Sequence, residues 1–457
     1  MVELLSPAGN FISLRAALEN GADSIYIGLA DNNMRANVSN FSLKDVEEAM
    51  ELVKEYSSKL YLCTNTIMKD EDIKKLEFDL ELIKEYEVDA LIVSDIGLAQ
   101  IASEVGIDPH MSVQENISNT YALKTLKKLG VTRAILSREL NIWEIQDIAK
   151  KSPIETEIFI HGAMCMAISG RCFLSYGLYG KSANCGECLQ PCRKDWRLSI
   201  AQDKDSDFFY ENDNDSSFIL KTFSDNINNI NDDLNLNDVN DVNDVNDVND
   251  DNIDTNNLND DSLGFYNLNT PNSKTSFISP NDMAMVEYIP QLIFTGVDAF
   301  KIEGRARGPD YVATTTRVYR EAIDSIENKT FIFKDSWMED LKKVFNRGFD
   351  TGFYFDIPYE ISTKNQSKYV KRDIAKVVNY YSKIGVAELQ LWDDLKIGDE
   401  ILIQGKTTGS ITQKVESMEI NGEFVEYCKK GNNVAIAIEN KVRENDFVYK
   451  LIERDLN

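Results

Sequence analysis

The chain of 457 residues is poor in several residue types on which common classes of protein depend. It has two histidines, four tryptophans, nine prolines and seven cysteines. No stretch approaches the roughly 18 consecutive apolar residues of a membrane-spanning helix, so no membrane span is predicted. The first residues, MVELLSPAGN, lack the basic stretch and apolar run of a secretory leader. We therefore expect a cytoplasmic protein with neither a membrane nor DNA as its partner.

The catalytic signatures of several hydrolases are missing as well. The chain contains no His-Glu-x-x-His pattern, which places two zinc ligands and a base on one helix, and no Gly-x-Ser-x-Gly nucleophile elbow. A cysteine protease is an alternative, because His161 and Cys165 are close in sequence. However, a nucleophilic thiol among four other thiols is open to oxidation and metal capture. Direct peptide hydrolysis is therefore the second interpretation.

Negative charge is concentrated in one segment. The net charge is −27, and residues 201–270 supply −16 of it, with 18 Asp and Glu against two Lys. The rest of the chain carries −11, which is ordinary for an enzyme. From Asn237 to Val248 the triplet Asn-Asp-Val repeats four times, and such low complexity predicts a disordered insertion in a surface loop. Calcium binding is disfavoured, since the glycine and the last glutamate of an EF-hand loop are missing.

Against this background, one segment is rich in thiols. HGAMCMAISGRCFLSYGLYGKSANCGECLQPC, residues 161–192, holds five of the seven cysteines. In a reducing compartment, clustered cysteines usually bind metal or carry out redox chemistry, and an odd total fits a disulfide framework poorly. Thiolates are soft ligands that suit iron–sulfur clusters or zinc. A closed Cys₄ zinc site that includes Cys185 and Cys188 is the alternative.

Eight short strand-like runs alternate with amphipathic helical patterns. The runs are residues 3–9, 23–29, 59–65, 90–95, 110–116, 133–139, 157–162 and 299–305. This alternation predicts parallel βα units, and eight is the number that closes a (β/α)8 TIM-like barrel. A doubly wound open sheet is the competing α/β architecture, but no glycine-rich phosphate turn follows the first run. Among the helices, one is predicted to begin after an N-cap at Ser42, with Asp45 three residues on.

A barrel places its chemistry at the C-terminal ends of the strands. The thiol-rich segment follows the seventh predicted strand, so it is expected at that face. Polar residues also end several of the runs: Asn65, Asp95, Gln114, Glu115, Arg138, Glu139, His161, Glu303 and Arg305. An inward-facing strand histidine such as His161 is as often structural as it is a base. Glu157, at the opposite end of its strand, is expected to be structural.

The thiol-rich segment also carries a family resemblance. EIFIHGAMCMAISGRCFLS, residues 157–175, resembles the signature of the peptidase U32 family, the collagenase-like peptidases. Further matching stretches are SPAGN (6–10), NGADSIYIGL (20–29), RANVSNFS (35–42), VDAFKIEGRARGPDYVATTTRVYREAID (297–324) and FNRGFDTGF (345–353). The resemblance covers nearly the whole chain except the acidic insertion.

The resemblance implies two kinds of activity. Some members are described as collagen-degrading peptidases, and others are oxygen-independent hydroxylases of tRNA wobble uridine, of 23S rRNA or of ubiquinone precursors. In the hydroxylases characterised for metal, four cysteines hold a 4Fe-4S cluster, and Cys165, Cys172, Cys188 and Cys192 are the matching candidates here. Ala284 stands where some members supply the fourth cysteine, and the Cys188-x₃-Cys192 pair offers two ligands instead.

Hydroxylation of wobble uridine in the family uses prephenate, a dicarboxylate. Arginines suit such a cosubstrate because a guanidinium group binds a carboxylate through two donors. We expect Arg35 and Arg307 to bind it and His161, Glu303 and Arg305 to be catalytic. The alternative is that the arginines pair with acidic residues and brace the barrel rim.

The remaining residues complete the expected organisation. Residues 1–203 and 274–360 form the barrel, residues 204–273 the acidic insertion, and residues 363–457 a small C-terminal β-barrel that resembles a module of translation factors. The preferred function is iron–sulfur-dependent hydroxylation of a tRNA base. A peptidase is second, and a non-catalytic factor bound to RNA or the ribosome is third. The C-terminal module is expected to contact RNA or to dock a protein partner.

Overall fold

The computed structural model describes residues 2–30, 40–194, 196–201, 217–222, 279–356, 358 and 365–454. The chain divides into two compact units, residues 1–193 with 278–457, and residues 194–277. Within the described residues, no helix is both long and apolar enough to cross a membrane.

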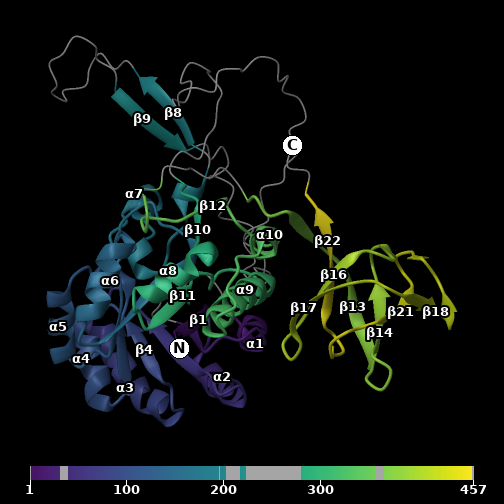
Figure 1. Ribbon diagram of the computed structural model, residues 1–457, viewed down its shortest axis with the longest axis horizontal. Helices are drawn as coiled ribbons and strands as arrows, with labels where there is room; N and C mark the ends of the chain where they lie inside the picture. The colour runs from purple at the N-terminus through teal and green to yellow at the C-terminus, as the bar shows by residue number, and fades with distance from the viewer. Residues whose placement is uncertain are drawn as a thin grey trace. The chain divides into compact units, whose positions relative to one another are not determined.

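A closed barrel of eight parallel strands forms the larger part of the first unit (Figure 1). Each strand pairs with the next, and the eighth, β11, pairs with both β7 and β1, which closes the ring. The strands are β1 (Glu3–Pro7), β2 (Ser24–Gly28), β3 (Lys59–Thr64), β4 (Ala90–Val93), β5 (Asp108–Met111), β6 (Arg133–Ile135), β7 (Glu155–Ala163) and β11 (Ala299–Ile302). The TIM-like fold is confirmed, and a strand occurs at each of the eight predicted runs. The fifth run, predicted over residues 110–116, shares only residues 110–111 with β5, because Val113–Glu115 forms a 3-10 helix, η1.

Helices surround the barrel and bury their apolar faces against it (Figure 1). They are α1 (Phe11–Glu19), α2 (Leu43–Glu55), α3 (Asp70–Glu85), α4 (Ile96–Val105), α5 (Thr120–Lys128), α6 (Ile142–Lys151), α8 (Ile289–Phe294) and α9 (Pro309–Glu327). The predicted cap of α2 is confirmed: the Ser42 side chain accepts from the Asp45 backbone N–H, and the Asp45 carboxylate accepts from the Ser42 backbone N–H. Such a cap stabilises a helix by about 1 kcal/mol.

Strand β7 is longer than the others and contains a bulge. Lys301 of β11 lies opposite Phe159, but the next residue, Ile302, lies opposite His161, so one residue of β7 is extra. A short antiparallel strand, β10 (Asp282–Ala284), pairs with the end of β7 beyond the bulge, and Ala284 lies opposite His161. The two-residue strand β12 (Phe349–Asp350) pairs with β10, and helix α10 (Asp335–Lys343) precedes it.

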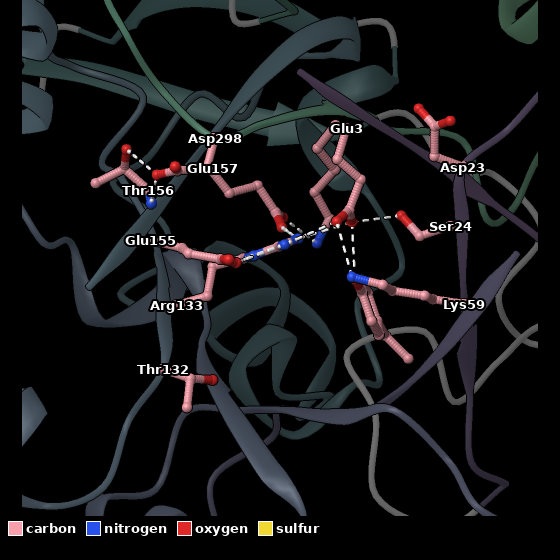
Figure 2. A network of polar contacts seen from close by, with 12 residues as sticks. Glu3, Asp23, Ser24, Lys59, Thr132, Arg133, Glu155, Thr156, Glu157 and Asp298 are labelled. Atoms are coloured by element: carbon pink, nitrogen blue, oxygen red, sulfur yellow. Dashed lines mark hydrogen bonds and ion pairs between the residues drawn. The ribbon is translucent and has the colours of Figure 1, made fainter. Parts of the chain in front are cut away.

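At its N-terminal end the barrel is filled by a network of charges (Figure 2). The Arg133 side chain is 3% exposed and contacts three carboxylates: Glu3 at 2.8 Å, Glu155 at 2.7 Å and Glu157 at 3.4 Å. Lys301 contacts Glu157 from the other side at 2.9 Å. These residues come from β1, β6, β7 and β11, so they meet inside the barrel. The expected structural role of Glu157 agrees with this position.

The network changes the ionisation of its members. Burial alone would raise the pKa of Glu3, but hydrogen bonds and charge from Arg133, with hydrogen bonds from Ser24 and Tyr61, lower it to about 2. Burial alone would lower the pKa of Arg133, but Glu3 and Glu157 raise it above its ordinary value. Glu3 and Arg133 are therefore both charged at neutral pH, and the charge of each stabilises the charge of the other.

The C-terminal residues form an antiparallel sheet region with its own apolar core. Its main sheet has the strand order β17-β16-β22-β13-β14-β21-β18-β19, and β15 pairs with β20. The strands are β13 (Tyr369–Tyr381), β14 (Val386–Leu391), β15 (Leu395–Lys396), β16 (Glu400–Gly405), β17 (Gly409–Lys414), β18 (Met418–Ile420), β19 (Glu423–Phe424), β20 (Tyr427–Cys428), β21 (Asn433–Ala437) and β22 (Phe447–Glu453). A turn at Asn421-Gly422 joins β18 to β19, with φ of 53° and 82° as a two-residue hairpin requires.

The second unit contains two described strands, β8 (Trp196–Ala201) and β9 (Ser217–Thr222), which pair antiparallel. Strand β9 falls inside the predicted acidic insertion. Most of that insertion, residues 204–273, lies outside the described residues, so the prediction of disorder stays a prediction, as do the domain boundaries.

Candidate functional site

The thiol-rich segment begins with the last three residues of β7, and its first cysteine, Cys165, lies two residues beyond the strand, at the C-terminal mouth of the barrel. It contains helix α7 (Leu174–Tyr179) and two short 3-10 helices, η2 (Ala183–Cys185) and η3 (Pro191–Arg193). Its first half is fixed to the end of β5: Asn116 donates to the Ser169 carbonyl at 2.9 Å, and Gly170 packs so closely on Gln114 that a Cβ atom would lie 2.9 Å from it. The predicted location of the segment is therefore confirmed.

Arg193 fixes the other end of the segment. It donates to Ser279 Oγ at 2.9 Å and to the Pro280 carbonyl at 2.8 Å, just before β10. Its second terminal nitrogen donates to the carbonyl of Met164, next to Cys165. The beginning and the end of the thiol-rich segment are thus tied together by one guanidinium group.

Three other thiols of the segment act on Cys192. Burial is the main cause that raises the pKa of Cys192 to about 11, Arg193 lowers it, and the charges of Cys165, Cys188 and Cys172 raise it further. Cys192 and these three residues are the four that the family resemblance implies as ligands. Cys165 and Cys185 are exposed, while Cys172, Cys188 and Cys192 are partly buried.

These residues fit a four-thiolate cofactor by their chemistry, since a 4Fe-4S cluster takes four cysteine ligands. Their sulfurs do not converge as they stand: among the described residues, no group of three or more Cys, His, Asp or Glu side chains is arranged to hold a metal ion. A bound cluster would therefore have to draw the thiols together. Ala284, which replaces the fourth cysteine of some family members, is paired in β10 and supplies no ligand.

His161 faces outward, contrary to the expected inward orientation. The β7 bulge turns its side chain to the helix side of the barrel, where Nδ1 lies 3.2 Å from the Tyr319 hydroxyl of α9. The rings of Tyr311 and Phe349 also pack against it. Burial lowers its pKa to about 3, so the imidazole is neutral. A catalytic role for His161 stays a prediction, and this environment favours a structural one.

Glu303 and Arg305 follow β11 at the barrel mouth. The Tyr26 hydroxyl lies 3.3 Å from the Glu303 carboxylate, and Arg305 is 4% exposed. Both residues also act on the buried thiol of Cys63 on β3. Burial is the main cause that raises the pKa of this thiol, while the charge of Arg305 lowers it and that of Glu303 raises it. Their backbones are tightly packed, because a Cβ atom on Gly9 would lie 2.4 Å from the Arg305 carbonyl and one on Gly162 equally close to that of Glu303.

Arg307 lies in a cluster of cations. Its guanidinium group stacks on the Phe345 ring at 3.6 Å, and Arg347 lies over the same ring at 4.8 Å. Burial and the charges of Arg307 and Arg193 lower the pKa of Arg347 to about 9, against the contact with Asp282. This cluster was not predicted as a unit, since its members are far apart in sequence. Arg35 lies outside the described residues.

Two of the polar residues that end predicted strands make contacts at the mouth that the sequence did not predict. Asn65 donates to Ser112 Oγ at 3.1 Å and to Gln114 at 3.2 Å, which joins the ends of β3 and β5. Arg138, three residues after β6, covers the Phe159 ring at 3.9 Å. Both stand at strand ends, and that position was the only signal that could have selected them.

Comparison with known proteins agrees with this architecture. The model of peptidase family U32 matches residues 9–364. A Methanocaldococcus jannaschii protein named an uncharacterized protease is 42% identical over 99% of both chains. A Porphyromonas gingivalis protein named collagenase is 33% identical over 99% of this chain and 98% of its own. The Bacillus subtilis tRNA hydroxylation protein P1 is 30% identical over 91% of this chain and 86% of its own. The chain therefore belongs to peptidase family U32.

Proposed function

We propose that this protein is an iron–sulfur-dependent, oxygen-independent hydroxylase of an RNA base, with tRNA wobble uridine as substrate and prephenate as cosubstrate. The observation that carries the proposal is the position of Cys165, Cys172, Cys188 and Cys192 in one segment at the mouth of a (β/α)8 barrel. Relatives named tRNA hydroxylation proteins, which match 80% to 100% of this chain, support the choice of substrate.

The four cysteines would hold a 4Fe-4S cluster, which supplies single-electron transfer when bound. Replacement of a base C–H by C–OH with water as the oxygen source releases two electrons and two protons, and the named cosubstrate, prephenate, would accept them in place of O₂. The role of this chain's residues is to bind and to position. Arg193 holds both ends of the cysteine segment, and the buried backbone after β11 fixes Glu303 and Arg305 beside the mouth.

The C-terminal sheet region offers a surface for the RNA or for a protein partner. Residues 363–457 contain 15 Lys and Arg and 15 Asp and Glu, so this region does not repel a polyanion as a whole. Several of its aromatic side chains are exposed: Tyr381, Trp392, Phe424, Tyr427 and Phe447. Exposed aromatic rings can stack on unpaired bases, which supports contact with the anticodon loop.

Proteolysis is the second candidate, favoured by the relatives named collagenase and uncharacterized protease. The described residues give it little support. Neither histidine is hydrogen-bonded to a cysteine: His161 contacts Tyr319, and Nδ1 of His110 is buried without a partner. Burial lowers the pKa of both imidazoles, which makes each a poor acceptor for a thiol proton.

Nucleoside mass spectrometry of tRNA tests the proposal. Deletion of the gene should remove 5-hydroxyuridine derivatives from the wobble position, and the wild-type gene should restore them. A Cys192→Ser gene should not restore them, whereas Cys428→Ser, in the C-terminal sheet region, should. Unchanged hydroxyuridine in the deletion strain would rule out this substrate. Cleavage of collagen or casein by metal-free protein, lost in Cys165→Ala, would favour the peptidase instead.

A further inference from the structure

Arg138 is a buried cation at the barrel mouth with an unusual set of contacts. It follows β6 by three residues and is only 8% exposed. Its guanidinium group stacks on the ring of Phe159, 3.9 Å from the ring centre, and Nη1 donates to the Ala163 carbonyl at 2.8 Å. Phe159 shares its face of β7 with Glu157, so this ring points into the barrel. Arg138 therefore lies over the barrel interior on its C-terminal side.

One edge of this guanidinium group has no protein acceptor. Nε is buried and makes no hydrogen bond, and within the described part of the chain Nη2 makes none either and is not fully buried. No carboxylate of the described residues lies within 4.0 Å of it, the limit for an ion pair. Nε–H and Nη2–H are parallel donors on the same edge, which is the edge that binds a carboxylate side-on through both its oxygens.

Arg133, in β6 itself, is a second buried arginine of this barrel and has a different set of contacts. It contacts the carboxylates of Glu3, Glu155 and Glu157. A buried charge is costly unless it is paired. The packing on Phe159 and the bond to Ala163 hold Arg138 in place but leave its charge uncompensated, which is the arrangement expected of a site whose counter-charge comes with a ligand.

We propose that Arg138 binds a carboxylate group of a small-molecule ligand in the barrel mouth, through Nε and Nη2. The identification of that ligand as prephenate rests on the proposed function. Arg305 follows β11 and Arg138 follows β6, the two strands that flank β7. A molecule with two carboxylates can therefore meet one cation from each side of β7. The Ala163 carbonyl that orients Arg138 is two residues before Cys165, which puts the bound ligand next to the cysteine segment.

Ligand-induced thermal stabilisation of the full-length, anaerobically purified protein tests this assignment. The probes are prephenate, malonate and inorganic phosphate, and the proteins are wild type, Arg138→Met, Arg138→Lys and Arg372→Met. Arg372 is an exposed arginine of the C-terminal sheet region paired with Asp393, so it controls for the loss of one positive charge. A dicarboxylate should raise the unfolding temperature of wild type and of Arg372→Met.

In Arg138→Met the dicarboxylate affinity should fall about tenfold or more, as expected for the loss of a charge-assisted pair. Arg138→Lys should bind with intermediate affinity, because an ammonium group keeps the charge but not the side-on geometry. Without ligand, the unfolding temperature of Arg138→Met should stay near that of wild type. This last readout separates a binding residue from a structural one.

The outcomes are distinguishable. If malonate but not prephenate stabilises wild type, and the effect is lost in Arg138→Met, the assignment of Arg138 stands and the proposed cosubstrate fails. If prephenate stabilises Arg138→Met as it does wild type, the cosubstrate stands and the assignment fails. The assignment is also overturned if only phosphate stabilises wild type, if no probe does, or if Arg138→Met is unfolded without ligand.

Discussion

The two ends of the barrel differ in whether their buried arginines are paired with carboxylates. At the N-terminal end, Arg133 and Lys301 are enclosed by the carboxylates of Glu3 and Glu157, and every charge has a partner of the opposite sign (Figure 2). At the mouth, Arg138 is also buried, and among the described residues its guanidinium group contacts a ring and a carbonyl but no carboxylate. Burial, and then the like charges of nearby thiols, raise the pKa of Cys192 there. The first end contributes stability, and we propose that the second receives ligands.

Replacement of Cys192 by serine should cause the largest change, a loss of iron and of activity. This change should be confined to the mouth of the barrel. The variant should lose nearly all of its iron and its hydroxylation activity, because one of four ligands to the cluster is removed. Its unfolding free energy in the metal-free state should change little, since the charge network at the other end is intact. Cys428→Ser is the matched control. Full iron occupancy in Cys192→Ser would remove this residue from the ligand set.

Replacement of Arg133 by methionine should destabilise the charge network at the N-terminal end of the barrel. The change leaves Glu157, which is fully buried, with one cation instead of two, and it removes the double contact of Glu3. Loss of one partner from a buried ion pair costs about 3–5 kcal/mol, which urea denaturation would measure. Lys151→Met, which removes a surface pair with Asp147, is the control and should cost less than about 1 kcal/mol. Equal effects of the two changes would contradict the stability role of the network.

The pH dependence of stability should come from the same end. The folded pKa of Glu3 is about 2, below its ordinary value, so its contribution is complete above pH ~4.5 and is lost as the pH falls towards 2. At about 1.4 kcal/mol per pKa unit, the loss is at most about 3.5 kcal/mol. Urea denaturation from pH 7 to 2 should therefore show less acid destabilisation in Glu3→Gln than in wild type. Parallel pH profiles would show that Glu3 is not the responsible group.

Gly162→Ala should have a smaller effect, because it disturbs the packing of β7 against the residues that follow β11. Gly162 has a φ of 106°, and a Cβ atom there would lie 2.4 Å from the Glu303 carbonyl. The strain should cost about 1–3 kcal/mol of unfolding free energy and weaken ligand binding by displacing Glu303. Gly177→Ala is the control, since a Cβ atom there meets nothing within 4 Å. Equal stability of the two variants would show that the close approach is not required.

The fold was predictable because its signals are local. The strands and the Ser42 cap depend on short runs of sequence, and they lie where they were expected except the fifth strand, which ends at Met111 and not at residue 116. The position of the cysteines at the mouth followed from strand order alone. These features depend on residues that are neighbours in the chain.

The chemistry inside the barrel was not predictable in the same way. The pair of Glu3 and Arg133 joins residues 130 positions apart, and hydrophobic periodicity carries no information about such contacts. The β7 bulge adds one residue and reverses the side on which His161 lies, which an alternating pattern cannot reveal. The same alternation could not distinguish Arg138, without a carboxylate partner, from Arg133, which has three.

Metal analysis of the anaerobically purified protein decides whether the thiols at the mouth hold an iron–sulfur cluster. The protein should be brown, with about four iron atoms per chain and broad absorbance near ~400 nm, and Cys165→Ser and Cys192→Ser should each abolish both properties. A colourless protein that contains one zinc ion, or no metal after anaerobic purification, would contradict the presence of this cluster.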